Sequence, residues 1–173
     1  TNNGTTWGPV NTAFAPYTVN GGQDTVATAG GSFFVYKKNT NNWYLAYPVT
    51  TDNLFANGKL QLTKSDGSHT TICTVADVGG ATTMSQSLAF VFTIDFPALG
   101  WSADGSTLYC VYSVVKSDTS NGGFNQRDLY IQYSLNDGTT WSTPVRLTNT
   151  PTIDETYPSV SLWNPGTSSG NYE

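Results

Sequence analysis

Carboxylate side chains stand directly before two segments that each carry an aromatic residue near their start. Asp95 precedes one of these segments, and Asp154 and Glu155 precede the other. If the segments occupy equivalent places in a repeat, the carboxylates lie at the same end of the fold. Paired carboxylates can act as acid and base in glycoside hydrolysis, or bind Ca²⁺ together with backbone carbonyls. The alternative is that they form turns and add surface charge. A third segment has Ser32 at this place, which would leave a ring of charge incomplete.

Other side chains with catalytic or metal-binding chemistry are few. Arg127 and Arg146 are the only arginines. They are expected at the start of the third strand and on the fourth strand of one repeat, as solvated surface charges. His69, the only histidine, falls in a predicted turn and has no cysteine or acidic partner at the spacing of a metal site. The sequence therefore predicts no cofactor, and Ca²⁺ stays an open alternative without a supporting motif.

The elements that must position these residues recur along the chain. Phe33, Phe96 and Tyr157 each stand second in a short segment, at intervals of about 60 residues. Each segment is followed by a turn and a new strand, and the later strands alternate in the manner of half-buried strands. Helix-forming residues are sparse in every window, so we expect strands and turns only. The expected strands cover residues 32–38, 43–47, 59–63 and 70–75, then 95–101, 107–112, 128–133 and 141–145, and finally 156–162.

One turn motif occurs twice and is the clearest sign of a repeat. Within the stretch from Ser134 to Trp141, residues Leu135 to Trp141 are matched at the start of the chain by Thr1 to Trp7. Its Asn can accept hydrogen bonds from backbone N–H groups two or more residues later, its Gly supplies a positive φ, and its Trp covers the turn. A degenerate copy without the Trp runs from Ser65 to His69. The residues assigned to the two full turns are Asn2, Gly4, Thr6 and Trp7 in the first, and Ser134, Asn136, Gly138, Thr140 and Trp141 in the second.

This motif resembles the Asp-box, or BNR repeat, of sialidase-like β-propellers, with Asn in place of the Asp. The resemblance is strongest from Asp128 to Val160, and residues 147–155 are similar to linkers in extracellular Bacteroidota proteins. It implies an all-β fold, a partial β-propeller of four-stranded antiparallel blades with Asp-box turns. Because a propeller needs about four to eight blades, the remaining blades are expected in a longer parent chain or in a partner chain. The implied blade boundaries are 1–31 for the end of one blade plus a linker, 32–94 and 95–155 for two blades, and 156–173 for the start of a further blade.

A β-sandwich is the alternative fold, because it also consists of short strands separated by turns. It gives no reason for the turn motif to recur. The net charge of -5 and the pI near 4.5 argue against nucleic-acid and anionic-membrane partners, and the sequence has no apolar run of membrane length. Cys73 and Cys110 are interpreted as two buried thiols, with a single bridge between neighbouring blades as the alternative.

Two functional hypotheses follow from these observations. The favoured one is a non-catalytic extracellular or cell-surface propeller module that acts in binding, adhesion or assembly, with a glycan or a protein as ligand. The alternative is a fragment of a sialidase-like glycoside hydrolase. Sialidases of this fold resemble one another in clamping the substrate carboxylate with three arginines, a geometry that a guanidinium fork favours. This chain holds only two arginines, so an enzyme would need further blades to complete its site.

Overall fold

The protein is all-β in the computed structural model, which describes residues 17–19, 24–26, 31–50, 58–83, 92–119, 122–161 and 163–164. No helix occurs among these residues, and none of their segments could therefore cross a membrane as a helix. The first copy of the turn motif, with Asn2, Gly4, Thr6 and Trp7, lies outside the described residues. The strands are β1 (Tyr17–Val19), β2 (Asp24–Val26), β3 (Phe33–Tyr36), β4 (Trp43–Thr50), β5 (Gly58–Lys64), β6 (His69–Thr74), β7 (Ile94–Ser102), β8 (Leu108–Thr119), β9 (Asn125–Ser134), β10 (Val145–Arg146) and β11 (Trp163–Asn164).

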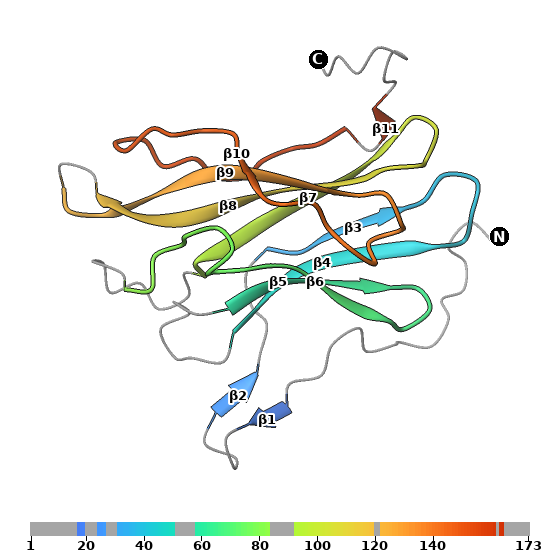
Figure 1. Ribbon diagram of the computed structural model, residues 1–173, viewed down its shortest axis with the longest axis horizontal. Helices are drawn as coiled ribbons and strands as arrows, with labels where there is room; N and C mark the ends of the chain where they lie inside the picture. Colours follow the sequence, from blue (N-terminus) through green and yellow to red (C-terminus); the bar gives the residue numbers. More distant parts are fainter. Residues whose placement is uncertain are drawn as a thin grey trace, which may run out of the picture.

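Two antiparallel meanders of four strands form the body of the protein and lie one above the other (Figure 1). Sheet 1 has the order β3-β4-β5-β6, and sheet 2 has the order β10-β9-β8-β7. The short strand β11 adds to sheet 2 beside β7 and runs parallel to it, whereas β1 and β2 pair separately as a hairpin. Strands β3 to β6 fall within residues 32–94 and strands β8 to β10 within residues 95–155, whereas β7 begins at Ile94 and β11, from the segment 156–173, joins sheet 2. No closed ring of sheets is present among the described residues.

Two predicted strands depart most from expectation. The strand predicted over 141–145 is reduced to β10. Pro144 has no N–H to donate. Ser142 N donates to the Tyr133 carbonyl, but Tyr133 N donates to the Ser142 hydroxyl rather than to a backbone carbonyl. The strand predicted over 156–162 is wrong over 156–161, which is not strand, and pairing with β7 begins only at Trp163.

The main hydrophobic core lies between the two sheets. Leu60 and Leu62 of sheet 1 and Leu108 and Trp101 of sheet 2 are fully buried in it, and the Tyr44 ring meets the Trp101 ring edge-on at 5.1 Å. Each such side chain contributes about 1.5–3 kcal/mol relative to an exposed one. Burial between the sheets is therefore what holds one meander to the other.

The two sheets pack with opposite faces. Turn hydrogen bonds from Lys37 N to Asn42 O and from Ser102 N to Thr107 O mark equivalent positions in the two units. By this alignment, Tyr44 and Ala46 of sheet 1 correspond to Tyr109 and Val111 of sheet 2. We call the face that carries these residues face A, and the opposite face, which carries Leu108 and Cys110 in sheet 2, face B.

Face A of sheet 1 contacts face B of sheet 2. Tyr44 and Ala46 belong to the core cluster that contains Leu108 and Cys110, whereas the face-B residues Tyr47 and Val49 of sheet 1 form a separate buried cluster. Equivalent faces would meet in a symmetric two-sheet sandwich. Here the packing is head to tail, and it can be repeated.

Candidate functional site

The three predicted carboxylates lie near one another at the start of β7 and β9. Asp95 is the second residue of β7, while Asp154 and Glu155 belong to the segment that returns along the start of β9. Arg127 joins them, since its N–H donates to Asp154 Oδ1 at 2.9 Å and its carbonyl accepts from Glu155 N at 3.1 Å. We call this group the rim cluster, which consists of Asp95, Phe96, Arg127, Asp154, Glu155 and Tyr157.

Asp95 is buried and serves the backbone around it. Its Oδ1 accepts hydrogen bonds from Phe96 N at 2.7 Å and from Gly31 N at 2.9 Å, and only 3% of the residue is exposed. Burial raises the pKa of this carboxyl, and the two N–H groups and Arg127 oppose that rise. Asp95 therefore fastens the chain before β3 to the start of β7.

Asp154 and Glu155 are also engaged. Arg127 Nη1 lies 3.2 Å from Asp154 Oδ2, and Thr150 Oγ1 donates to Glu155 Oε1 at 2.6 Å. Glu155 Oε2 and Arg127 Nε are buried and have no hydrogen-bond partner among the described residues. The cluster thus holds one unused acceptor and one unused donor beneath its surface.

The expectation that Arg127 is a solvated surface charge is wrong. Its side chain is only 13% exposed, and the guanidinium lies 5.7 Å from the centre of the Phe96 ring. The Phe96 ring in turn lies 4.3 Å from the ring of Tyr157, a residue that is 75% exposed. Arg127, Phe96 and Tyr157 therefore contact one another in a row, with the two rings tilted by 43°, and the outermost member faces solvent. We call this row the stack.

The backbone of the stack is strained in the same way at two places. Phe96 has φ 52° and Tyr157 has φ 55°, and each precedes a proline. In β7 the strain accompanies a bulge, because Phe96 and Pro97 together oppose the single residue Tyr112 of β8. Non-glycine residues in this conformation cost about 1–3 kcal/mol each and gather at functional sites. Tyr157 and Phe96 therefore share both a left-handed backbone conformation and a following proline.

Arg146 and His69 also differ from expectation. Arg146 pairs with the buried carboxylate of Asp128 rather than with solvent alone. His69 is exposed, but it opens β6 rather than lying in the turn, and its Nδ1 is 2.7 Å from Thr63 Oγ1, which is 2.7 Å from the buried Tyr47 hydroxyl. Among the described residues no three His, Cys, Asp or Glu side chains are placed to hold a metal ion.

The turn from Ser134 to Trp141 has the hydrogen bonds expected of it. Asn136 Oδ1 accepts from Thr140 N at 2.9 Å, and its amide donates to Thr140 Oγ1 at 2.9 Å. Ser134 Oγ accepts from Gly138 N at 2.8 Å, and Gly138 has φ 73°. The Trp141 side chain is partly buried against the core. Asn136 therefore links both ends of the turn through its side chain.

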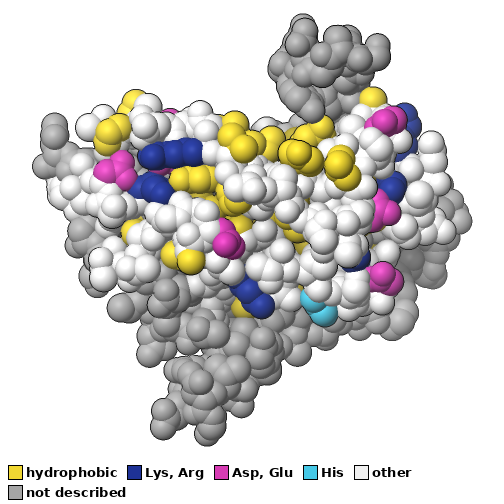
Figure 2. All heavy atoms as spheres, in the orientation of Figure 1, with side chains coloured by type: hydrophobic (Ala, Val, Ile, Leu, Met, Phe, Trp, Pro, Cys, Tyr) yellow, Lys and Arg dark blue, Asp and Glu magenta, His cyan; other side chains and the backbone are white. Residues whose placement is uncertain are grey.

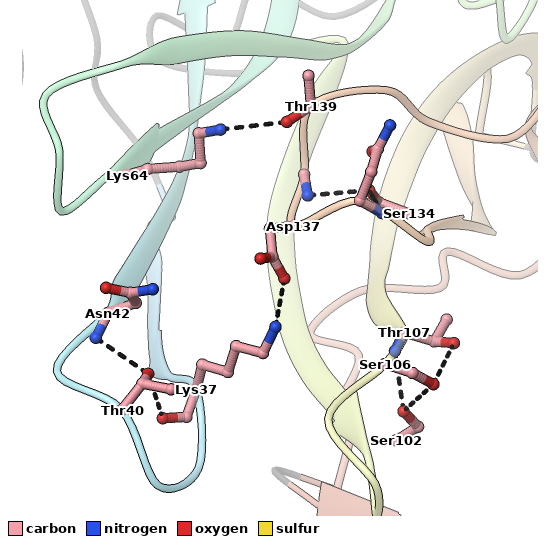
Figure 3. Close-up of polar contacts among 12 residues, drawn as sticks. Lys37, Thr40, Asn42, Lys64, Ser102, Ser106, Thr107, Ser134, Asp137 and Thr139 are labelled. Atoms are coloured by element: carbon pink, nitrogen blue, oxygen red, sulfur yellow. Dashed lines mark hydrogen bonds and ion pairs between the residues drawn. The ribbon is translucent and has the colours of Figure 1, made fainter.

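This turn also joins the sheets, which its sequence did not indicate. Lys37 from the end of β3 forms a 2.6 Å ion pair with Asp137, and Lys64 from the end of β5 donates to Thr139 (Figure 3). Thr70 Oγ1 donates to Gly138 O at 2.7 Å. The Asn-Asp-Gly turn of sheet 2 is therefore seated on the strands of sheet 1.

Sequence reasoning singled out Asp95, Asp154 and Glu155 as one group but missed the stack. The available signal was the aromatic-proline pair that stands at Phe96 and again at Tyr157. The partners of Arg127 carried no comparable signal, since Asp154 is remote in the sequence. Comparison with known family models, with curated proteins and with solved structures gave no match for this chain.

Proposed function

We propose that this chain is a non-catalytic binding module of an extracellular or cell-surface protein, built from propeller-type repeats. The observation that carries the proposal is the Arg127–Phe96–Tyr157 stack, which presents an exposed aromatic ring beside the start of β7. The contact between the Tyr157 ring and the Phe96 ring, 4.3 Å between centres, orients the exposed ring before any ligand arrives. A preorganised surface of this kind favours binding, because its side chains lose little conformational entropy when the ligand binds.

The repeat architecture is supported by the head-to-tail contact of face A with face B. In a two-sheet sandwich, inward-facing apolar residues alternate along each strand with polar residues on the two outer faces. In contrast, the outer face of sheet 2 carries Leu129, Ile131 and Val145, and β8 is buried almost continuously from Leu108 to Val115. Sheets covered on both sides are expected in a stack that continues, and a propeller is the closed form of such a stack.

A glycan is the ligand class that best fits the stack. The face of a sugar ring packs on an exposed aromatic ring, while its hydroxyl groups pair with charged groups beside it. Tyr157 offers the ring, and Asp154, which is 43% exposed at its side chain, offers carboxylate oxygens next to Arg127. A protein ligand with a similar polar and aromatic surface is the second candidate.

The engagement of the charged groups favours binding over hydrolysis. A general acid and a base need carboxyl groups that are free to exchange protons with substrate. Here the Asp95 carboxylate accepts hydrogen bonds from two backbone N–H groups, and Asp154 forms an ion pair with Arg127. Glu155 accepts a hydrogen bond from the Thr150 hydroxyl. A sialidase-like clamp would need several free guanidinium groups, and both arginines of this chain are paired with carboxylates.

The proposal is tested by glycan-array binding together with a Tyr157→Ala variant. We expect the variant to bind at least about tenfold more weakly, which is the loss of one stacking contact worth roughly 1.4 kcal/mol. Phe124→Ala is the matched control, because Phe124 is also an exposed aromatic residue, 55% accessible, and lies outside the stack. Equal binding by both variants would overturn the role of Tyr157, and turnover of a fluorogenic sialoside by the purified chain would favour the enzyme.

A further inference from the structure

Face A of sheet 2 retains an exposed apolar surface. Beside the half-buried Leu129 and Ile131, Tyr133 is 45% exposed and Val145 is 55% exposed. Figure 2 shows apolar side chains gathered in a band along the upper part of the described surface, where sheet 2 lies in Figure 1. In sheet 1 the same face is fully covered, since Leu60 and Leu62, the equivalents of Leu129 and Ile131, are 0% exposed.

The opposite end of the protein carries an exposed aromatic patch. Phe34 and Tyr36 on face B of sheet 1 are 46% and 53% exposed. The Phe34 ring lies 5.0 Å from that of Tyr36 and is stacked on that of Trp43 at 5.8 Å. In sheet 2 the equivalent of Tyr36 is Trp101, which is fully buried against sheet 1. One molecule thus displays both halves of a contact that it already makes internally.

We propose that a second copy of this chain docks its aromatic patch of Phe34, Tyr36 and Trp43 onto the exposed part of face A formed by Ile131, Tyr133 and Val145. A second copy is the expected partner because, at the internal interface, face B of one sheet already covers face A of the other. Charge on face A does not oppose the contact, because Arg127, the arginine on this face of β9, is paired with Asp154. Such a head-to-tail contact is heterologous, so it can grow into a ring or an open chain.

Two features distinguish this contact from the internal contact between the sheets. The chain's own segment 157–161 already lies over β7, since a Cβ on Gly100 would collide with Val160 and with the carbonyl of Ser161. The second copy therefore contacts the β9 and β10 side of face A rather than repeating the internal register. In addition, Ser102 stands where sheet 1 has Lys37, so no equivalent of the Lys37–Asp137 ion pair forms. We expect the association to be weaker than the contact between the two sheets.

Sedimentation velocity over a concentration series tests the proposal with two variants of exposed residues, Tyr36→Glu and Val145→Glu. The wild-type chain is expected to associate as its concentration rises, and each variant alone is expected to require at least about tenfold higher concentration. Circular dichroism and thermal unfolding check that both variants fold. Ile153→Glu is the control, because Ile153 is 56% exposed and belongs to neither surface.

Mixing the two variants tests the head-to-tail arrangement itself. Each variant keeps one intact surface, so an equimolar mixture is expected to form one-to-one heterodimers that grow no further. A monomeric wild-type chain, or a mixture that stays monomeric, would overturn the proposal. Because neither substitution touches the rim cluster, glycan binding by Tyr157 can fail or succeed independently of this result.

Discussion

At the scale of single residues, Gly138 shows how a turn motif becomes a contact between sheets. Its φ of 73° is open to glycine without strain, and a Cβ at this position would overlap Leu62 Cδ2 of sheet 1. Two separate requirements therefore fall on one residue, a local one from the turn and a tertiary one from the neighbouring sheet.

Gly138→Ala is expected to destabilise the protein more than Gly67→Ala. Both glycines have positive φ, so each alanine costs about 1–2 kcal/mol in backbone strain. Nothing lies within 4 Å of a Cβ on Gly67, whereas the overlap with Leu62 adds about 1–3 kcal/mol at Gly138. Urea denaturation of the two variants measures the difference. Equal losses of unfolding free energy would show that the turn is not seated on sheet 1.

Asp95→Asn is expected to stabilise the protein at neutral pH. Burial raises the pKa of Asp95 above its ordinary value of 3.8, so the folded state holds the proton more tightly than the unfolded state does. Wild-type stability therefore falls as pH rises from that value through the folded pKa. The amide of the variant keeps an acceptor for Gly31 N and Phe96 N and has no proton to lose. The advantage of the variant should shrink as pH is lowered toward 3.8, and a constant difference across pH would contradict burial as the cause.

At the scale of elements, side-chain contacts hold β10 to sheet 2 more than its backbone hydrogen bonds with β9 do. It pairs with β9 over only two residues, while Arg146 donates to the Thr148 carbonyl and pairs with Asp128. Asp128 is 2% exposed, and Arg146 forms the ion pair with its carboxylate.

Arg146→Ala is expected to cost about 3–5 kcal/mol of unfolding free energy, because it leaves the buried Asp128 carboxylate without its partner. Asp128→Asn combined with Arg146→Ala should recover much of this loss, since the amide can still accept the hydrogen bond from Thr150 N. Chemical denaturation of the single and double variants provides the comparison. A double variant as unstable as the single one would mean that Arg146 acts through packing.

The elements were largely predictable from the sequence, and their partners were not. Alternation and turn residues located β4, β5, β8 and β9 because each strand carries its own pattern. The segment 156–161 matched the same pattern but is not strand, because a ladder also needs a neighbouring strand in register, which a local pattern does not supply. The burial of Arg127 was not predicted, because it depends on residues 147–155 returning along β9. The sequence around Arg127 carries no local signal for that tertiary contact.

At the scale of the whole molecule, the contact between the sheets encloses both thiols. Cys73 of β6 and Cys110 of β8 are buried and unbridged, in agreement with the interpretation of two small hydrophobic residues. They belong to opposite sides of one core cluster. A reagent can reach either of them only after the sheets separate.

Both thiols are therefore expected to react with a water-soluble disulfide reagent only as fast as the protein unfolds globally. Burial raises the pKa of Cys73 to about 12 and that of Cys110 well above its ordinary value, so the reactive thiolate is scarce in the folded state as well. Labelling in native buffer and in denaturant, resolved by peptide mass spectrometry, compares the two sites. They should label together, with a denaturant dependence equal to that of unfolding followed by circular dichroism. Rapid native labelling of one cysteine alone would show that the sheets open locally, and that the contact of face A with face B is not the cooperative centre of the fold.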